Sequence, residues 1–145
     1  MRNMDRLLID TNIILDYLLT RTPFYEAADK LIQECMKGTV RSCIAAHSFP
    51  NMFYILRKDF TVEERKKLLK NLCTLFDVEG IDQDKIIKAL DNEDFSDFED
   101  RLQVECAVSY AADYIITRNL SDFTESPVKA ITPEEYLESM KEPHK

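Results

Sequence analysis

The stretch Leu7-Leu8-Ile9-Asp10-Thr11-Asn12-Ile13-Ile14 decides the fold. Three consecutive apolar residues that end at a carboxylate are typical of a short buried strand. A helix from about Asn12 is predicted next, because apolar residues recur at helical spacing at Ile13, Ile14, Tyr17 and Leu18. Asp10 therefore stands where a buried strand gives way to a helix.

The rest of the chain repeats this alternation of strand and helix. Further strands are predicted at 40–45, 75–79, 114–116 and 128–131, and helices at 22–37, 48–58, 61–74, 82–90, from 96, and 132–140. Local signals set the helix ends: Thr22 as an N-cap before Pro23, Gly38 as a C-terminal cap, and capping boxes at 61–64, 96–99 and 132–135. Such alternation favours an α/β fold with a central parallel sheet between two helix layers.

The gross composition bounds the class of protein. A length of 145 residues indicates one domain, which we place at 1–140 with a flexible tail at 141–145. No segment approaches the roughly 20 apolar residues of a membrane helix, and charged residues interrupt the N-terminus, so we expect no membrane contact, no signal peptide and a cytoplasmic protein. Zinc-type spacing is absent, so the cysteines are expected to be reduced thiols packed as small hydrophobes: Cys35, Cys43, Cys73 and Cys106.

The charge balance has two sides. A net charge of −8 disfavours nonspecific binding of nucleic acid by bulk electrostatics. Carboxylates are nevertheless what a divalent metal requires, and a bound cation reverses the local sign. Positive charge concentrates at Arg57, Lys58, Arg65, Lys66, Lys67 and Lys70. This run is interpreted either as a solvated helix face or as a contact surface for an RNA backbone.

Acidic and amide side chains are predicted to meet at one edge of the sheet. Asp10 ends the first strand, Asn119 follows the strand at 114–116, and Asp97 and Asp100 lie in the first turn of a helix. Sites in open parallel sheets form beyond the carboxyl ends of the strands. Carboxylate oxygens suit Mg²⁺ and Mn²⁺, which activate water for attack on a phosphodiester without a Ser-His or Cys-His nucleophile.

Each acid also has a simpler explanation. Asp10 could be the N-cap of the helix that follows it, and Asp97 could interact with a helix dipole. Glu99 fits the capping-box partner of Ser96. Capping explains Asp100 poorly, because it lies one position further into the helix.

Three motifs together resemble the PIN-domain family. These are Leu8-Ile9-Asp10-Thr11-Asn12-Ile13-Ile14-Leu15-Asp16, then Asp97-Phe98-Glu99-Asp100-Arg101-Leu102-Gln103, then Ala112-Asp113-Tyr114-Ile115-Ile116-Thr117-Arg118-Asn119 with Asp122-Phe123. Their order and spacing fit over nearly the whole chain. The resemblance implies a PIN-like three-layer α/β/α sandwich and RNA hydrolysis dependent on Mg²⁺ or Mn²⁺. Many small bacterial members are toxins of VapBC toxin–antitoxin pairs, which implies an antitoxin partner, and many dimerise, which implies a homodimer.

The resemblance also assigns residues. Asp10 and Asp100 match metal-binding acids, Asp97 is an extra acid that can join them, and Thr117 matches a residue near the metal. Two positions depart from the family pattern, which usually has a carboxylate at each. Asn51 is the nearest match to a glutamate on the helix after the second strand, and Asn119 replaces the aspartate of Thr-Arg-Asp. An amide oxygen still coordinates but brings no charge, so metal affinity should fall.

The sequence therefore predicts a divalent-metal-dependent endoribonuclease, with toxin identity implied by the resemblance. Catalysis is assigned to Asp10, Asp97 and Asp100, and metal binding to these three and Asn119. Supporting roles are assigned to Asn12, Asn51, Thr117 and Asp122. One alternative is a catalytically weak or inactive module that binds RNA or protein, motivated by the two amides. A phosphatase-like hydrolase with Asp10 as nucleophile is the weakest alternative, because such chemistry typically needs a second aspartate where Asn12 stands.

Overall fold

Five parallel strands form the centre of the protein, which we describe from a computed structural model covering residues 4–92 and 97–141. The strand order is β3-β2-β1-β4-β5, and all four pairings are parallel. The strands are β1 (Arg6–Ile9), β2 (Arg41–Ala45), β3 (Asp77–Glu79), β4 (Tyr114–Ile116) and β5 (Lys129–Ile131). The strand that opens the chain is thus the middle of the sheet, and the predicted parallel sheet is confirmed.

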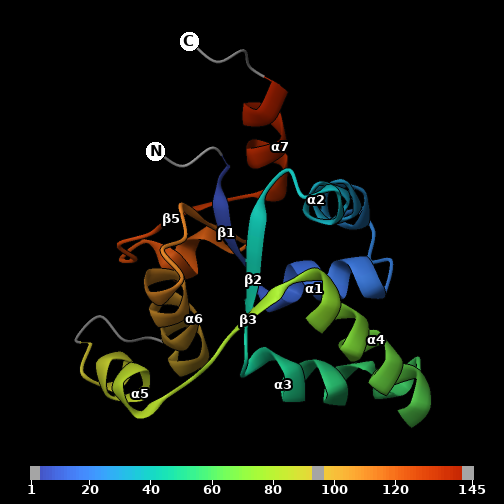
Figure 1. Ribbon diagram of the computed structural model, residues 1–145, viewed down its shortest axis with the longest axis horizontal. Helices are drawn as coiled ribbons and strands as arrows, with labels where there is room; N and C mark the ends of the chain where they lie inside the picture. The colour runs from blue at the N-terminus through green and yellow to red at the C-terminus, as the bar shows by residue number, and fades with distance from the viewer. Residues whose placement is uncertain (1–3, 93–96, 142–145) are drawn as a thin grey trace.

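Helices cover both faces of this sheet (Figure 1). The helices are α1 (Thr11–Leu18), α2 (Tyr25–Lys37), α3 (Ser48–Ile55), α4 (Val62–Leu75), α5 (Gln83–Leu90), α6 (Phe98–Ser109) and α7 (Pro133–Lys141), with short 3₁₀ segments η1 (Leu56–Lys58) and η2 (Leu120–Phe123). None of the helices in the described ranges is long and apolar enough to cross a membrane.

The apolar run of β1 explains why two helix layers are needed. Leu7, Leu8 and Ile9 are all fully buried, although successive side chains of a strand point to opposite faces. Leu7 and Ile9 pack in the core beneath α1, α2 and α3, whereas Leu8 packs in a second core with α6. A strand that is apolar at every position can only be satisfied by layers on both sides. The predicted three-layer α/β/α architecture is therefore confirmed.

Several helix ends follow the predicted chemistry. Thr61 and Glu64 form a reciprocal capping box at the start of α4, with N–H to side-chain oxygen distances of 2.8 and 3.1 Å. Thr132 and Glu135 do the same before α7. Gly38 ends α2 with φ of 78°, a left-handed conformation that glycine adopts without strain.

Other predicted boundaries are wrong. The second helix begins at Tyr25 rather than at Thr22, because residues 22–24 form a turn in which the Tyr25 N–H donates to the Arg21 carbonyl. The third helix ends at Ile55 and continues only as η1.

Cys73 is exposed on α4, whereas the other three cysteines are buried as predicted. Of the predicted tail, Lys141 is the last residue of α7, and residues 142–145 lie outside the described ranges.

Candidate functional site

Asp10 lies at the carboxyl end of the central strand, and its carboxylate is fixed by two elements that are remote in sequence. Its side chain is only 4% exposed. The Gln103 amide of α6 donates to Oδ1 at 3.0 Å, and the Thr117 hydroxyl after β4 donates to Oδ2 at 2.8 Å. Asp10 occupies the N-cap position of α1 but makes no side-chain capping bond, so the simpler explanation of Asp10 as a helix cap is wrong.

The first turn of α6 brings Asp97 and Asp100 together. The Asp97 carboxylate accepts a hydrogen bond from the Asp100 N–H at 2.9 Å, which makes Asp97 the N-cap of this helix. The predicted cap, Ser96, lies outside the described residues, and Glu99 is not the N3 partner of the observed cap. Asp97 therefore has a structural function of its own, while Asp100 has none of this kind.

Asp100 lies in a strongly negative environment. Its carboxyl group is half-buried, and burial is the largest of the effects that raise its pKa to about 7. Repulsion from neighbouring carboxylates also raises this pKa, in the order Asp97, Asp122, Asp10 and Glu99. A carboxyl group held so far above its ordinary pKa is destabilised when ionised, and a bound cation would remove that penalty.

A small pocket opens at this edge of the sheet between α1, α3 and the start of α6. Its lining residues include Asp10, Asn12, Asn51, Glu99 and Asp100. Asn12 and Asn51, both predicted as supporting residues, thus lie beside the two acids that match the family's metal ligands. The structure brings Asp10 and Asp100 to one cavity from elements that are about 90 residues apart, as expected for the carboxyl edge of a parallel sheet.

Two buried acceptors beside this pocket have no hydrogen-bond partner among the described residues, Gln103 Oε1 and His47 Nδ1. His47 Nε2 lies 3.1 Å from the Glu99 carbonyl oxygen, which can only accept, so Nε2 carries the proton and Nδ1 a free electron pair. Burial lowers the pKa of His47, which keeps the ring neutral. These two acceptors are therefore available to a donor that the described residues do not supply.

Other predicted residues lie further out. The Thr117 hydroxyl both donates to Asp10 and accepts the Asn119 N–H at 3.0 Å. The Asn119 side chain is not part of the pocket lining. Asp122 is exposed on η2 and acts on Asp100 through its charge. Within residues 4–92 and 97–141, no three His, Cys, Asp or Glu side chains are arranged so that they could hold a metal ion together.

Sequence reasoning missed Gln103, His47 and the Thr11–Ser48 pair. Gln103 stands three residues after Asp100, so helical spacing places both on one face of α6. That spacing was the available signal. The hydroxyl groups of Thr11 and Ser48 lie 2.6 Å apart and join the start of α1 to the start of α3. No local sequence pattern predicts the contact between Thr11 and Ser48 or the contact between His47 and Glu99.

A buried ion pair stabilises the loop that follows β4. Asp16 on α1 is fully buried, and the Arg118 guanidinium donates to it at 2.9 and 3.3 Å. Arg21 lies 3.5 Å from the same carboxylate. Arg118 also covers the Phe24 ring at 4.0 Å. Because Thr117 precedes Arg118, this anchor holds the hydroxyl that binds Asp10.

Asp16→Ala is expected to lower the free energy of unfolding by about 2–3 kcal/mol, measured by urea denaturation. This is less than the roughly 3–5 kcal/mol of a fully buried pair, because Arg118 keeps some contact with water. Arg21→Ala serves as the control and should cost less than about 1 kcal/mol, since its contact is long and partly exposed. Equal losses in both variants would show that the Asp16–Arg118 pair is not the main anchor.

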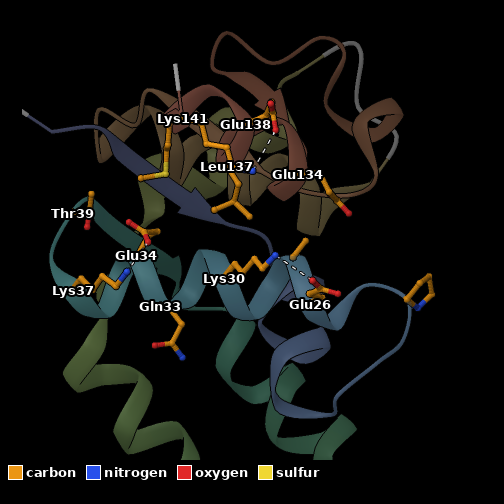
Figure 2. Close-up of a pocket in the computed structure, with 13 residues that line it drawn as sticks. Glu26, Lys30, Gln33, Glu34, Lys37, Thr39, Glu134, Leu137, Glu138 and Lys141 are labelled. Atoms are coloured by element: carbon orange, nitrogen blue, oxygen red, sulfur yellow. Dashed lines mark hydrogen bonds and ion pairs between the residues drawn. The ribbon is translucent and has the colours of Figure 1, made fainter. Parts of the chain in front are cut away.

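A wider groove lies between α2 and α7 and shares no lining residue with the pocket at Asp10 (Figure 2). Its walls are charged, but every lysine in them pairs with a glutamate: Lys30 with Glu26, Lys37 with Glu34, and Lys141 with Glu138. Among the described residues this leaves only Glu134 of the charged lining without an ion pair. A cavity whose charged groups neutralise each other offers little to an ion. The acidic pocket at the sheet edge is therefore the candidate site.

Fold and site together define an α/β domain with an acidic pocket at the carboxyl edge of its sheet. The model of the PIN domain family matches residues 6–121, so the chain belongs to the PIN domain family. PIN domains are typically nucleases. None of the curated proteins matches the sequence at a significant level.

Solved structures of this fold cover nearly the whole chain. A chain of a toxin–antitoxin complex from Klebsiella pneumoniae is 21% identical with a TM-score of 0.64, over 88% of this chain and 97% of that one. A chain of FitAcB from Neisseria gonorrhoeae is 15% identical with a TM-score of 0.66, over 88% of this chain and 98% of that one. A chain of VapBC-1 from nontypeable Haemophilus influenzae is 18% identical with a TM-score of 0.64, over 89% of this chain and 98% of that one. At these identities the likeness concerns the fold.

Proposed function

We propose that this PIN domain is a divalent-metal-dependent endoribonuclease that acts as the toxin of a toxin–antitoxin pair. One observation carries the proposal: Asp10 and Asp100 line the same pocket, with Asp10 held by two hydrogen bonds and Asp100 raised in pKa by its acidic neighbours. Maintaining that repulsion costs stability, and a metal ion offsets the cost.

The donor set fits a hard cation such as Mg²⁺ or Mn²⁺. Asp10 and Asp100 would hold the ion, with water at its remaining coordination positions. The Asp97 carboxylate caps α6 and the Asn119 side chain is outside the pocket lining, so both would act on the ion only through water. When bound, the ion activates water and stabilises negative charge on the phosphate. Thr117 and Gln103 fix the orientation of the Asp10 carboxylate, while the neutral His47 ring holds the Asp97–Asp100 turn through the Glu99 carbonyl. Asn12 and Asn51 offer amide groups that can orient the RNA strand.

The proposal is tested by incubating the purified protein with a labelled single-stranded RNA. We expect cleavage with Mn²⁺ or Mg²⁺ and none in excess EDTA, and DNA of the same sequence should be cut more slowly. RNA that is cut equally well in EDTA would contradict the metal-dependent mechanism.

The toxin assignment draws on neighbours whose structures contain toxin–antitoxin complexes. We expect induced expression to arrest growth, and co-expression of a small antitoxin-like protein encoded just upstream to relieve the arrest. Light scattering of the purified protein tests the proposed homodimer. Growth that is unaffected by expression of active nuclease would separate the enzyme from the toxin role.

A second candidate is a PIN module with weak or no catalysis that binds RNA or protein. Two observations favour it: Asn51 lies in the pocket, and no three His, Cys, Asp or Glu side chains of the described residues are arranged to hold a metal ion. Titration calorimetry with Mn²⁺ distinguishes the two. A module without catalysis should show no heat of metal binding at millimolar Mn²⁺ while still binding RNA.

Thr117→Val is expected to weaken Mn²⁺ binding by about 10- to 100-fold, because the Asp10 carboxylate loses the donor that orients it. Valine has the shape of threonine, so the core should tolerate it. The dissociation constant is measured by calorimetry, with Thr124→Val on the loop after η2 as the matched control. An unchanged dissociation constant would show that Thr117 does not act on the metal site.

A further inference from the structure

The pocket extends along one face of α3. Ser48, Asn51 and Ile55 all line it, and their spacing of three and four residues places them on one side of the helix. Asn12 and Leu15 line the opposite wall from α1. The cavity therefore runs from the acids at the sheet edge to Ile55, which is the last residue of α3.

Positive charge begins directly beyond that end. Arg57 and Lys58 lie in η1, two and three residues after Ile55, and Lys67 and Lys70 are exposed on α4. Figure 1 shows α3 and α4 side by side, projecting from the carboxyl edge of the sheet. A chain that leaves the pocket at the Ile55 end of α3 therefore meets Arg57 and Lys58 first, and the helix that carries Lys67 and Lys70 packs alongside.

These cations have no acidic partner among the described residues. Arg57, Lys58, Lys67 and Lys70 make no ion pair there, whereas lysines on α2, α5 and α7 pair with neighbouring carboxylates. Although the chain has a net charge of −8, these four cations give the hairpin of α3, η1 and α4 a local excess of positive charge. Unpaired cations attract an anionic ligand.

Arg57 also has a geometry suited to nucleic acid. Its guanidinium lies 3.7 Å from the centre of the Tyr54 ring and donates to the Tyr54 carbonyl at 2.9 Å. The Tyr54 side chain is 61% exposed. The protein thus presents a planar cation on an aromatic ring at the surface, an arrangement on which nucleic-acid bases stack.

We propose that Arg57, Lys58, Lys67 and Lys70 form a basic track that binds the backbone of the RNA strand entering the pocket along α3. This inference rests on the proposed nuclease function and adds the path of the substrate. Phosphate groups complement the charge of the track, and the pocket that holds Asp10 reaches Ile55, two residues before Arg57. An acidic protein would also complement the positive charge of the track, but only an RNA substrate would have to continue from the track into the pocket at Asp10.

The test compares two triple variants with the same change in net charge. The first variant combines Lys58→Gln, Lys67→Gln and Lys70→Gln and so removes three of the four cations of the track. None of these three side chains makes a hydrogen bond or ion pair among the described residues, whereas Arg57 is left in place because it bonds to Tyr54. The control changes Lys30, Lys37 and Lys141 to Gln in the groove of Figure 2. Binding of a labelled single-stranded RNA is measured by fluorescence anisotropy in EDTA, over a range of salt concentrations.

The track variant is expected to bind RNA about 10-fold more weakly at low salt. The slope of log K against log salt should fall by about 2, since each phosphate contact on single-stranded RNA contributes about 0.7. The control should change affinity less than about 2-fold and keep its slope. In cleavage assays the track variant should show a raised KM with little change in kcat.

Equal losses in both triple variants would assign the effect to net charge and overturn the track. A track variant that binds RNA as tightly as the parent protein would also overturn the track, and so would a parent protein that binds no RNA. Poly-glutamate is the second probe, and tight binding of this peptide that the track variant loses, with RNA binding unchanged, would reassign the surface to an acidic protein. Failure of cleavage alone, with RNA binding that still depends on the track, would contradict the nuclease but not the track.

Discussion

Asp10→Asn is expected to lower the rate of metal-dependent RNA cleavage by at least about a thousandfold, equivalent to about 4 kcal/mol of lost transition-state stabilisation. The substitution removes the negative charge that a divalent ion requires, at the best-held carboxylate of the pocket. Single-turnover cleavage of labelled RNA measures the rate, and calorimetry should show weakened Mn²⁺ binding in parallel.

The variant should still fold. The new amide group of residue 10 needs an acceptor, and Gln103 Oε1 is buried without a partner among the described residues. Rotation of the Gln103 amide can satisfy it. Asp84→Asn on α5 is the matched control, because the same chemical change there affects only an exposed pair with Lys88. Cleavage that survives Asp10→Asn, in a protein with normal thermal unfolding, would remove Asp10 from the mechanism.

The fold was accessible from sequence because its signals are local and agree with one another. Leu7, Leu8 and Ile9 form an apolar run without alternation, which a strand buried on both faces requires. Thr61 with Glu64 and Thr132 with Glu135 set helix starts by chemistry confined to four residues. Where two local signals compete, the sequence does not choose between them.

The start of α6 illustrates this limit. Two pairs of residues fit a cap followed by an acid three residues later: Ser96 with Glu99, and Asp97 with Asp100. The two possible caps differ by one residue in position. The structure has Asp97 as the cap. This choice places Asp100 at the third position of α6, and it depends on how α6 packs against the sheet. The roles of Gln103 and His47 likewise depend on contacts with residues that are 93 and 52 positions away.

Asp100→Asn is expected to abolish metal-dependent cleavage and also to stabilise the metal-free protein at alkaline pH. The Asp100 pKa is about 7 in the folded protein against an ordinary value of 3.8, so the folded state holds this proton more tightly than the unfolded chain. Unfolding therefore releases a proton between about pH 4 and pH 7, and the contribution of Asp100 to stability falls as pH rises through that window. An asparagine side chain does not titrate, so the variant escapes this loss.

Thermal unfolding in EDTA, followed at pH 5 and pH 8 for both proteins, measures the effect. The melting temperature of Asp100→Asn should exceed that of the parent at pH 8, and the difference should shrink at pH 5. Mn²⁺ should raise the melting temperature of the parent but not that of the variant, because binding to the folded state stabilises it. Asp82→Asn is the control of opposite sign, since the Lys85 N–H lowers the pKa of that capping carboxylate and the substitution should destabilise α5. If Asp100→Asn melted below the parent at pH 8 without metal, the carboxylates around Asp100 would not repel one another as the site requires, and there would be no electrostatic reason for a cation to bind there.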